Sequence, residues 1–80
     1  MKRVLISGCE GQVGKVFVKH LLLKNYTVIG LDIADESVND IEYYRCDITD
    51  KEDVSRAFDK INGPLQFLLN VAGVSVFSPF

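Results

Sequence analysis

Three glycines at even spacing are the first feature of this sequence that could serve chemistry. Gly8, Gly11 and Gly14 follow the apolar run 4–6 and precede a stretch with helical periodicity. Where a strand turns into a helix, the first glycine permits the tight turn, the second lets a ligand approach the backbone, and the third lets the helix pack closely on the sheet. The free N–H groups at a helix start attract phosphate. The loop is therefore expected to bind a pyrophosphate.

An acidic side chain ends the next apolar run. Asp32 follows residues 27–31, about 20 residues beyond the glycines, where a carboxylate accepts hydrogen bonds from the ribose of a bound dinucleotide. The same carboxylate repels the 2′-phosphate of NADP, and Ile33, Ala34, Asp35 and Glu36 bring no basic side chain. We therefore expect a dinucleotide as partner, with NAD favoured over NADP as cofactor. The alternative is a solvated carboxylate at a strand end.

The remaining reactive side chains predict no second site. His20 falls beside an apolar helical row, which favours a partly buried helix residue over a ligand or base. No cluster of His, Cys and carboxylates has metal-binding spacing, so no metal is expected. Cys9 and Cys46 predict reduced thiols rather than a disulfide framework. Within the loop, Cys9 and Glu10 are expected to be filler; a reactive thiol at Cys9 is the alternative, because helix N-termini lower thiol pKa values.

The strands that must hold these residues are predicted from apolar runs. Continuous apolar runs at 4–6, 27–31 and 65–71 are typical of parallel strands buried on both faces, and the more polar run 43–48 predicts another strand. Residues 34–40 are polar and weakly periodic, which predicts a loop or one poor helical turn.

Two helices are predicted between these strands. The first covers 12–24 and stops at Asn25 in a left-handed conformation. Its sheet-facing row is expected to contain Val13, Phe17 and Leu21. The second begins at a capping box in which Thr49 caps the helix and Glu52 reaches back. Its apolar row consists of Val54, Ala57, Phe58 and Ile61.

The order of elements predicts the fold. Strands that alternate with helices form parallel sheets with right-handed crossovers. We expect an α/β fold over residues 1–80, a partial doubly wound Rossmann fold with strand order 3-2-1-4. The fourth strand would then have a bare edge, which predicts a homo-oligomer or a partner that completes the sheet.

Composition narrows the partners. The formal net charge is −2, which disfavours nucleic acid and anionic membrane surfaces, since both attract basic patches. No apolar run approaches the roughly 18 residues of a membrane span. The apolar run after Met1-Lys2-Arg3 ends at Ser7, so no signal-peptide core is present and a cytoplasmic protein is expected.

Two further stretches complete a family resemblance. Asp47-Ile48-Thr49-Asp50 is similar to the motif after the third strand of short-chain dehydrogenases/reductases, and residues 69–74 (Leu-Asn-Val-Ala-Gly-Val) are similar to that family's Asn-Asn-Ala-Gly motif. With the glycine loop and Asp32, they make the chain resemble the N-terminal half of this NAD(P)-binding family.

The resemblance implies a site. Asp47 and Ile48 would border the adenine ring, while Asn70, Ala72 and Gly73 would stabilise the sheet and lie beside the nicotinamide-side ribose. The cofactor-binding residues expected in all are Gly8, Gly11, Gln12, Val13, Gly14, Asp32, Ile33, Asp47, Ile48, Asn70, Ala72 and Gly73.

The family's chemistry requires a Tyr-x-x-x-Lys pair. None of Tyr26, Tyr43 and Tyr44 has a lysine four residues on, so no catalytic residue is expected and the isolated chain is predicted to be inactive. The resemblance implies the NAD-binding portion of an oxidoreductase that moves hydride between nicotinamide and an alcohol or carbonyl. The alternatives are a stand-alone NAD-binding or sensor module, and a fragment of the extended, epimerase-like branch, whose glycine spacing this chain shares.

Overall fold

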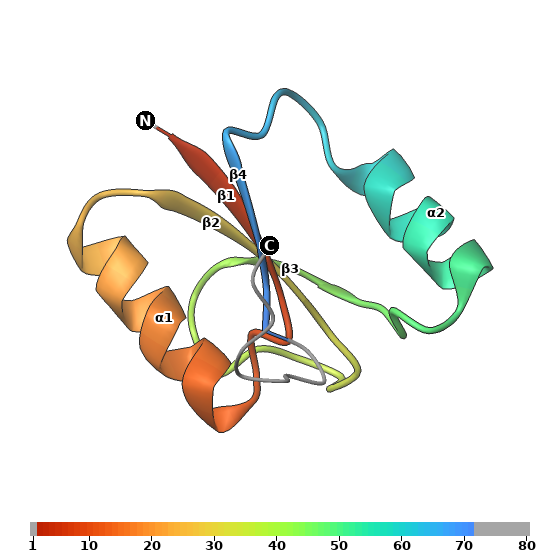
Figure 1. The fold of residues 1–80 in the computed structure, drawn as a ribbon, viewed down its shortest axis with the longest axis horizontal. Helices are drawn as coiled ribbons and strands as arrows, with labels where there is room; N and C mark the ends of the chain where they lie inside the picture. Colours follow the sequence, from red (N-terminus) through yellow and green to blue (C-terminus); the bar gives the residue numbers. More distant parts are fainter. Residues whose placement is uncertain (1, 72–80) are drawn as a thin grey trace.

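The described chain, residues 2–71 of a computed structural model, forms one parallel sheet between two helices (Figure 1). The strand order is β3-β2-β1-β4, and every neighbouring pair is parallel, which confirms the predicted order and fold class. The elements are β1 (Arg3–Ser7), α1 (Gln12–Leu23), β2 (Thr27–Asp32), β3 (Glu42–Arg45), α2 (Lys51–Lys60) and β4 (Phe67–Asn70).

The sheet is covered on both faces, so its central strands are apolar on both. Side chains alternate between the faces of a strand. On the α1 face, the buried cluster contains Val4, Ile6 and Val28. On the α2 face, it contains Leu5 and Ile29. The two central strands contribute side chains to both clusters, so their positions are apolar on both faces. This explains the continuous apolar runs in the sequence.

The strands at the two edges are shorter than predicted. β3 ends at Arg45 rather than at residue 48. The Cys46 N–H makes one more hydrogen bond to β2, at the Asp32 carbonyl (2.7 Å). The chain then turns away from the sheet, and a hydrogen bond from the Thr49 N–H to Asp47 holds this turn. β4 begins at Phe67, two residues later than predicted. The segment 34–40 contains no helix or strand, in agreement with the predicted loop.

The sheet-facing row of α1 differs from the prediction. Gly14 and Val18 are buried and Leu21 packs against the core, whereas Val13 and Phe17 are 54% and 43% exposed. The row that contains Gly14 faces the sheet because only a glycine allows the helix to come this close to the loop. Periodicity counts large apolar side chains and gives glycine no weight, which is why it selected the wrong face. Asn25 has φ 67°, the predicted left-handed stop.

The start of α2 also differs by one residue. Asp50, not Thr49, is the N-cap, and its carboxylate accepts hydrogen bonds from the N–H groups of Glu52 and Asp53. Thr49 instead donates its hydroxyl and N–H to the Asp47 carboxylate. The predicted cap at Thr49 is therefore wrong by one residue, because aspartate is at least as favourable an N-cap as threonine.

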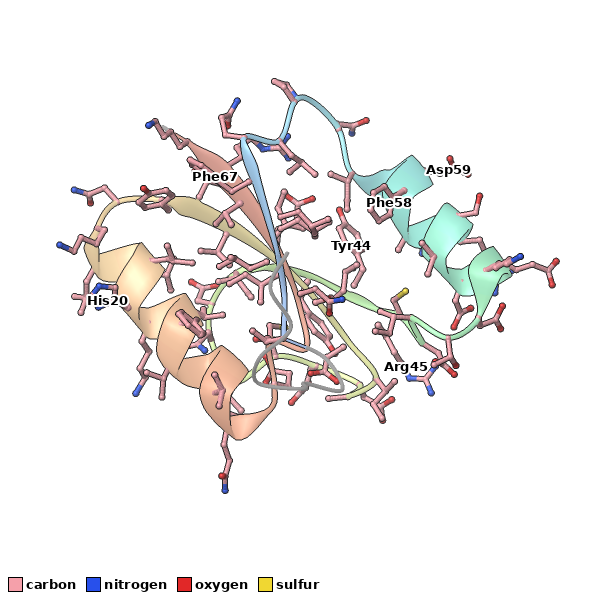
Figure 2. All side chains as sticks on the ribbon, viewed as in Figure 1. His20, Tyr44, Arg45, Phe58, Asp59 and Phe67 are labelled. Atoms are coloured by element: carbon pink, nitrogen blue, oxygen red, sulfur yellow. The ribbon has the colours of Figure 1, made fainter. Side chains whose placement is uncertain are left out.

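In the described part of the chain, β4 lies at one edge of the sheet. Phe67 and Leu68 are 46% and 61% exposed there (Figure 2 labels Phe67), and the Phe67 ring packs against Tyr26 and lies under the Lys2 ammonium. That this edge is bare in the protein stays a prediction. No helix within residues 2–71 is long and apolar enough to cross a membrane.

Candidate cofactor-binding site

The glycine loop joins β1 to α1 at the carboxyl end of the sheet, and two of its glycines are required by the protein itself. Gly8 has φ 81°, a left-handed conformation that favours glycine. At Gly14, an added Cβ would lie 2.0 Å from the Gly8 carbonyl oxygen and 2.8 Å from the Cys9 Cα. Gly14 therefore allows the close packing of helix on loop that the sequence predicted for it.

Gly11 is not required by the packing of the protein. Its backbone is extended (φ −74°, ψ 170°), which any residue adopts, and an added Cβ would make only ordinary contact, 3.6 Å from the Gly8 carbonyl oxygen. Gly11 also lines the cleft described below. Gly11 therefore presents bare backbone to the cleft.

The two helix starts differ in how they satisfy their N–H groups. The carboxylate of Asp50 caps α2, whose first turn also carries Glu52 and Asp53. α1 has Gly11 as its N-cap, with no side chain to accept a hydrogen bond, and its first turn contains no acidic residue. The first N–H groups of a helix lack intrahelical partners and carry partial positive charge. The start of α1 is therefore the one suited to an anionic group.

A cleft of about 350 Å³ lies beside the glycine loop. It brings together residues that the sequence places far apart, and six of the predicted site residues line it: Gly8, Gly11, Asp32, Ile33, Asp47 and Ile48. Cys46, Thr49 and Val71 complete the lining and were not predicted, because their place follows from where β3 and β4 end.

Three predicted residues at the start of α1 do not line the cleft. The side chains of Gln12 and Val13 line an apolar depression on the exposed side of α1, with Val16, Phe17 and His20. His20 is exposed rather than partly buried (Figure 2). Gly14 lies beneath the loop, as described above. Ala72 and Gly73 lie outside the described residues.

Asp32 ends β2 at the edge of the cleft. One carboxylate oxygen accepts a hydrogen bond from the Glu10 N–H (2.8 Å) and the other from the Ile33 N–H (2.6 Å). Each carboxylate oxygen has two lone pairs, so capacity remains for further donors such as ribose hydroxyls. These bonds fix the carboxylate against the glycine loop.

Glu10 is a residue that the sequence interpretation missed. Its carboxylate accepts hydrogen bonds from the Ser37 hydroxyl (2.6 Å) and the Val38 N–H (2.9 Å), so it is not filler. Burial raises the pKa of Glu10, but the hydrogen bonds from Ser37 and Val38 outweigh it and hold the pKa below its ordinary value. An acidic residue inside a loop suited to phosphate is electrostatically unfavourable. This unfavourable charge was the feature of the sequence that could have indicated a specific role for Glu10.

Asp47 and Ile48 form the opposite wall of the cleft. The hydroxyl and N–H of Thr49 both donate to Asp47 Oδ1, at 2.6 and 2.9 Å, and lower the pKa of this carboxyl. Ile48 is 39% exposed and Ile33, which lines the same cleft, is 64% exposed. Two exposed isoleucines that line one cleft form a surface suited to a flat apolar ring.

Asn70 is tied to the strand beside it. The Ser7 hydroxyl donates to Asn70 Oδ1 (2.8 Å), and the Val71 N–H donates to the Ser7 carbonyl (2.9 Å). Ser7 thus joins β1 to the β4 segment through both its side chain and its backbone carbonyl. This supports the sheet-stabilising role that the resemblance implied for Asn70.

The thiols and phenols near the cleft are not activated. Burial raises the pKa of the fully buried Cys9 to about 12, which argues against a reactive thiolate there. Burial also raises the pKa values of Cys46 and Tyr43. The Tyr44 hydroxyl donates to Glu42, which raises its pKa. Catalysis through a tyrosinate would require the opposite shift.

The parallel sheet, the glycine loop and the acid that ends β2 define a Rossmann-type α/β protein of the dinucleotide-binding class. The sequence matches the NAD dependent epimerase/dehydratase family over residues 4–78. The chain therefore belongs to this family, whose glycine spacing it shares.

Individual relatives agree with this assignment. The chain is 34% identical to an uncharacterized oxidoreductase of Schizosaccharomyces pombe, over 96% of this chain and 32% of that protein. Its fold is similar to the crystal structure of a short chain dehydrogenase from Leptospira borgpetersenii with bound NAD⁺, with TM-score 0.77, 36% identity, and coverage of 99% of this chain and 34% of that one. The chain thus spans about a third of the length of these two relatives.

Proposed function

We propose that residues 1–80 form the NAD-binding portion of an NAD-dependent oxidoreductase or epimerase-like protein, with the cofactor in the cleft at the carboxyl ends of the strands. The observation that carries the proposal is Gly11. The protein's own packing explains Gly8 and Gly14, whereas it leaves room for a side chain at position 11, and a ligand that approaches the backbone there would account for the glycine.

Each part of the cofactor has residues that fit it. The pyrophosphate would lie at Gly11 and the first N–H groups of α1, those of Gln12, Val13 and Gly14. Asp32 would bind the adenosine ribose, and Ile33 and Ile48, beside Asp47, would border the adenine. Asn70 with Ala72 and Gly73 would lie toward the nicotinamide. When bound, NAD supplies the hydride-accepting ring, and this part of the chain binds and orients it.

A preference for NAD over NADP follows from Asp32. Its carboxylate lines the cleft and would repel a 2′-phosphate. No basic residue directly follows Asp32 in the sequence, but Arg45 lies opposite Asp32 in the sheet register. The Nε of Arg45 bonds the Ile33 carbonyl (3.1 Å) and lies 3.4 Å from Asp35. We assign the preference to Asp32 because Asp32 lines the cleft and Arg45 does not.

A non-catalytic NAD-binding module is the second candidate for this chain. The observation that favours it is the state of the tyrosines. Burial raises the pKa of Tyr43, whose hydroxyl donates to the Ala34 carbonyl (2.5 Å), and the Tyr44 hydroxyl donates to Glu42. Neither phenol is poised to exchange a proton with a substrate, so turnover by this chain alone is not expected.

The test is calorimetric titration of the chain with NAD and NADP. NAD is expected to bind at least about tenfold more tightly than NADP, which is about 1.4 kcal/mol. Asp32→Asn removes the charge and is expected to narrow this ratio, because the repulsion of the 2′-phosphate is lost. Asp59→Asn removes an exposed carboxylate on α2 (Figure 2) and is the control for loss of a negative charge away from the cleft; it is expected to leave the ratio unchanged. Equal affinity for both cofactors in the unmodified chain would contradict the assignment of Asp32.

A further inference from the structure

Glu10 connects two segments that form neighbouring walls of the cleft. It lies in the glycine loop between Gly8 and Gly11, and its carboxylate bonds the segment that follows β2, through Ser37 and Val38. Its own N–H donates to Asp32, from which that segment departs. The glycine loop and the segment after β2 are thus joined at both the backbone and the side chain of one residue.

The segment held by Glu10 depends on side-chain bonds for its position. Residues 33–40 contain no helix or strand, so no sheet or helix ladder fixes them. Arg45 and Tyr43 bond the carbonyls of Ile33 and Ala34 at the start of the segment, and Glu10 bonds its middle, at Ser37 and Val38. Within that segment, the Ser37 hydroxyl donates to Glu10 and accepts from the Asn39 N–H (3.1 Å), which folds a short turn around the Glu10 carboxylate. Hydrogen bonds to a charged acceptor are about twice as strong as neutral ones.

We propose that Glu10 is a positioning residue for the adenosine end of the cofactor: it holds the segment 33–38 against the glycine loop, so that Ile33 and Asp32 present a preformed surface to the adenosine. This inference rests on the proposed function. It concerns the adenosine end only, because the start of α1 and Gly11, which would bind the pyrophosphate, contact the loop without Glu10's side chain.

The expected effect follows from preorganisation. If the segment occupies its position for only a tenth of the time without Glu10, the apparent dissociation constant of an adenosine ligand rises about tenfold. A glutamine at position 10 keeps an amide oxygen for the Val38 N–H, and the Ser37 hydroxyl can accept from its amide nitrogen. Glu10→Gln is therefore expected to retain the tether, whereas Glu10→Ala loses it.

The experiment is an NMR titration of the 80-residue chain with adenosine monophosphate and, separately, with inorganic pyrophosphate. Glu10→Ala is expected to weaken adenosine monophosphate binding about tenfold, and Glu10→Gln less than about threefold. Both variants remove the negative charge of Glu10 from the loop, so each is expected to raise pyrophosphate affinity to the same extent, and the difference between the two variants isolates the tether. Asp59→Ala, an exposed carboxylate on α2, is the control for loss of charge alone. Faster hydrogen exchange at the Val38 amide in Glu10→Ala would report the released segment.

Several outcomes would overturn the inference. Unchanged adenosine monophosphate affinity in Glu10→Ala would show that the tether does not position the ligand. Equal losses in Glu10→Ala and Glu10→Gln would show that charge, not tethering, matters. Should Glu10→Ala fail to fold, Ser37→Ala, which removes one tether, is expected to weaken adenosine monophosphate about threefold, and no loss would contradict the proposal. Failure of the unmodified chain to bind NAD or either probe would refute the proposed function itself.

Discussion

The three loop glycines serve three separate physical purposes, and each purpose can be tested at the scale of one residue. Gly8 needs its positive φ, Gly14 needs the absence of a Cβ against the Gly8 carbonyl, and Gly11 needs neither. A substitution at Gly14, which sequence reasoning alone would choose to abolish binding, therefore disturbs packing as well as the cleft. A substitution at Gly11 separates ligand binding from folding.

Gly11→Ser and Gly14→Ala are predicted to behave oppositely. Serine is a good N-cap, so Gly11→Ser should leave the free energy of unfolding within about 0.5 kcal/mol of the unmodified chain. The same side chain occupies ligand space and should weaken NAD binding about tenfold or more. Gly14→Ala forces a clash with backbone and should lower the free energy of unfolding by about 3 kcal/mol. Urea unfolding and calorimetry measure the two effects; tight NAD binding by Gly11→Ser would contradict the role of Gly11.

At the scale of elements, the alternation of strands and helices was predictable and the details of their contacts were not. Continuous apolar runs identify strands buried on both faces, and their alternation with helices indicates a doubly wound fold, which has the strand order 3-2-1-4. The same fold places Asp32 beside the glycine loop. The contact face of α1 was wrong because Gly14 sets it, and a glycine adds nothing to hydrophobic periodicity.

Contacts between segments distant in sequence were beyond pattern reasoning. The bond from Ser37 to Glu10 joins residues 27 positions apart and depends on where the loop after β2 folds. Cys46 and Thr49 line the cleft because β3 ends at Arg45, an end set by the hydrogen bonds around Asp47. Secondary-structure propensity describes one segment at a time, whereas the positions of these cleft residues depend on contacts with segments distant in sequence.

The start of α2 gives a prediction at this scale. Asp50→Ala should lower the free energy of unfolding by about 1 kcal/mol, because two N–H groups lose their acceptor and the helix start loses a negative charge. Thr49→Ala removes a bond to Asp47 on the exposed surface and should cost about half as much or less. Urea unfolding of both variants measures the difference, and a larger cost at Thr49 would restore it as the cap.

For the whole molecule, the edge of the described sheet at β4 is the candidate for pairing with further chain. Among the described strands β4 pairs with β1 alone, and its Phe67 and Leu68 side chains are exposed. An edge with exposed apolar side chains is a template for pairing with another chain. We therefore propose that a second copy or a partner completes the sheet at β4.

This proposal predicts self-association that depends on Leu68. The chain should form dimers or larger species at high concentration in sedimentation velocity, and Leu68→Lys should shift it toward monomer, since edge lysines oppose strand pairing. Leu23→Lys, at an 82% exposed position on α1, is the matched control and should leave association unchanged. An equal effect of both substitutions would indicate nonspecific apolar association rather than pairing at the edge.

Following the backbone amide resonances during an NAD titration tests most directly whether the pyrophosphate of NAD lies at the start of α1. The largest chemical-shift changes are expected at Gly11, Gln12 and Val13, with smaller changes at Ile33 and Ile48. No change is expected at Lys51 and Glu52, where Asp50 already caps α2. Shifts at the start of α2 in place of α1, or no shifts near the glycine loop at saturating NAD, would contradict this placement of the pyrophosphate.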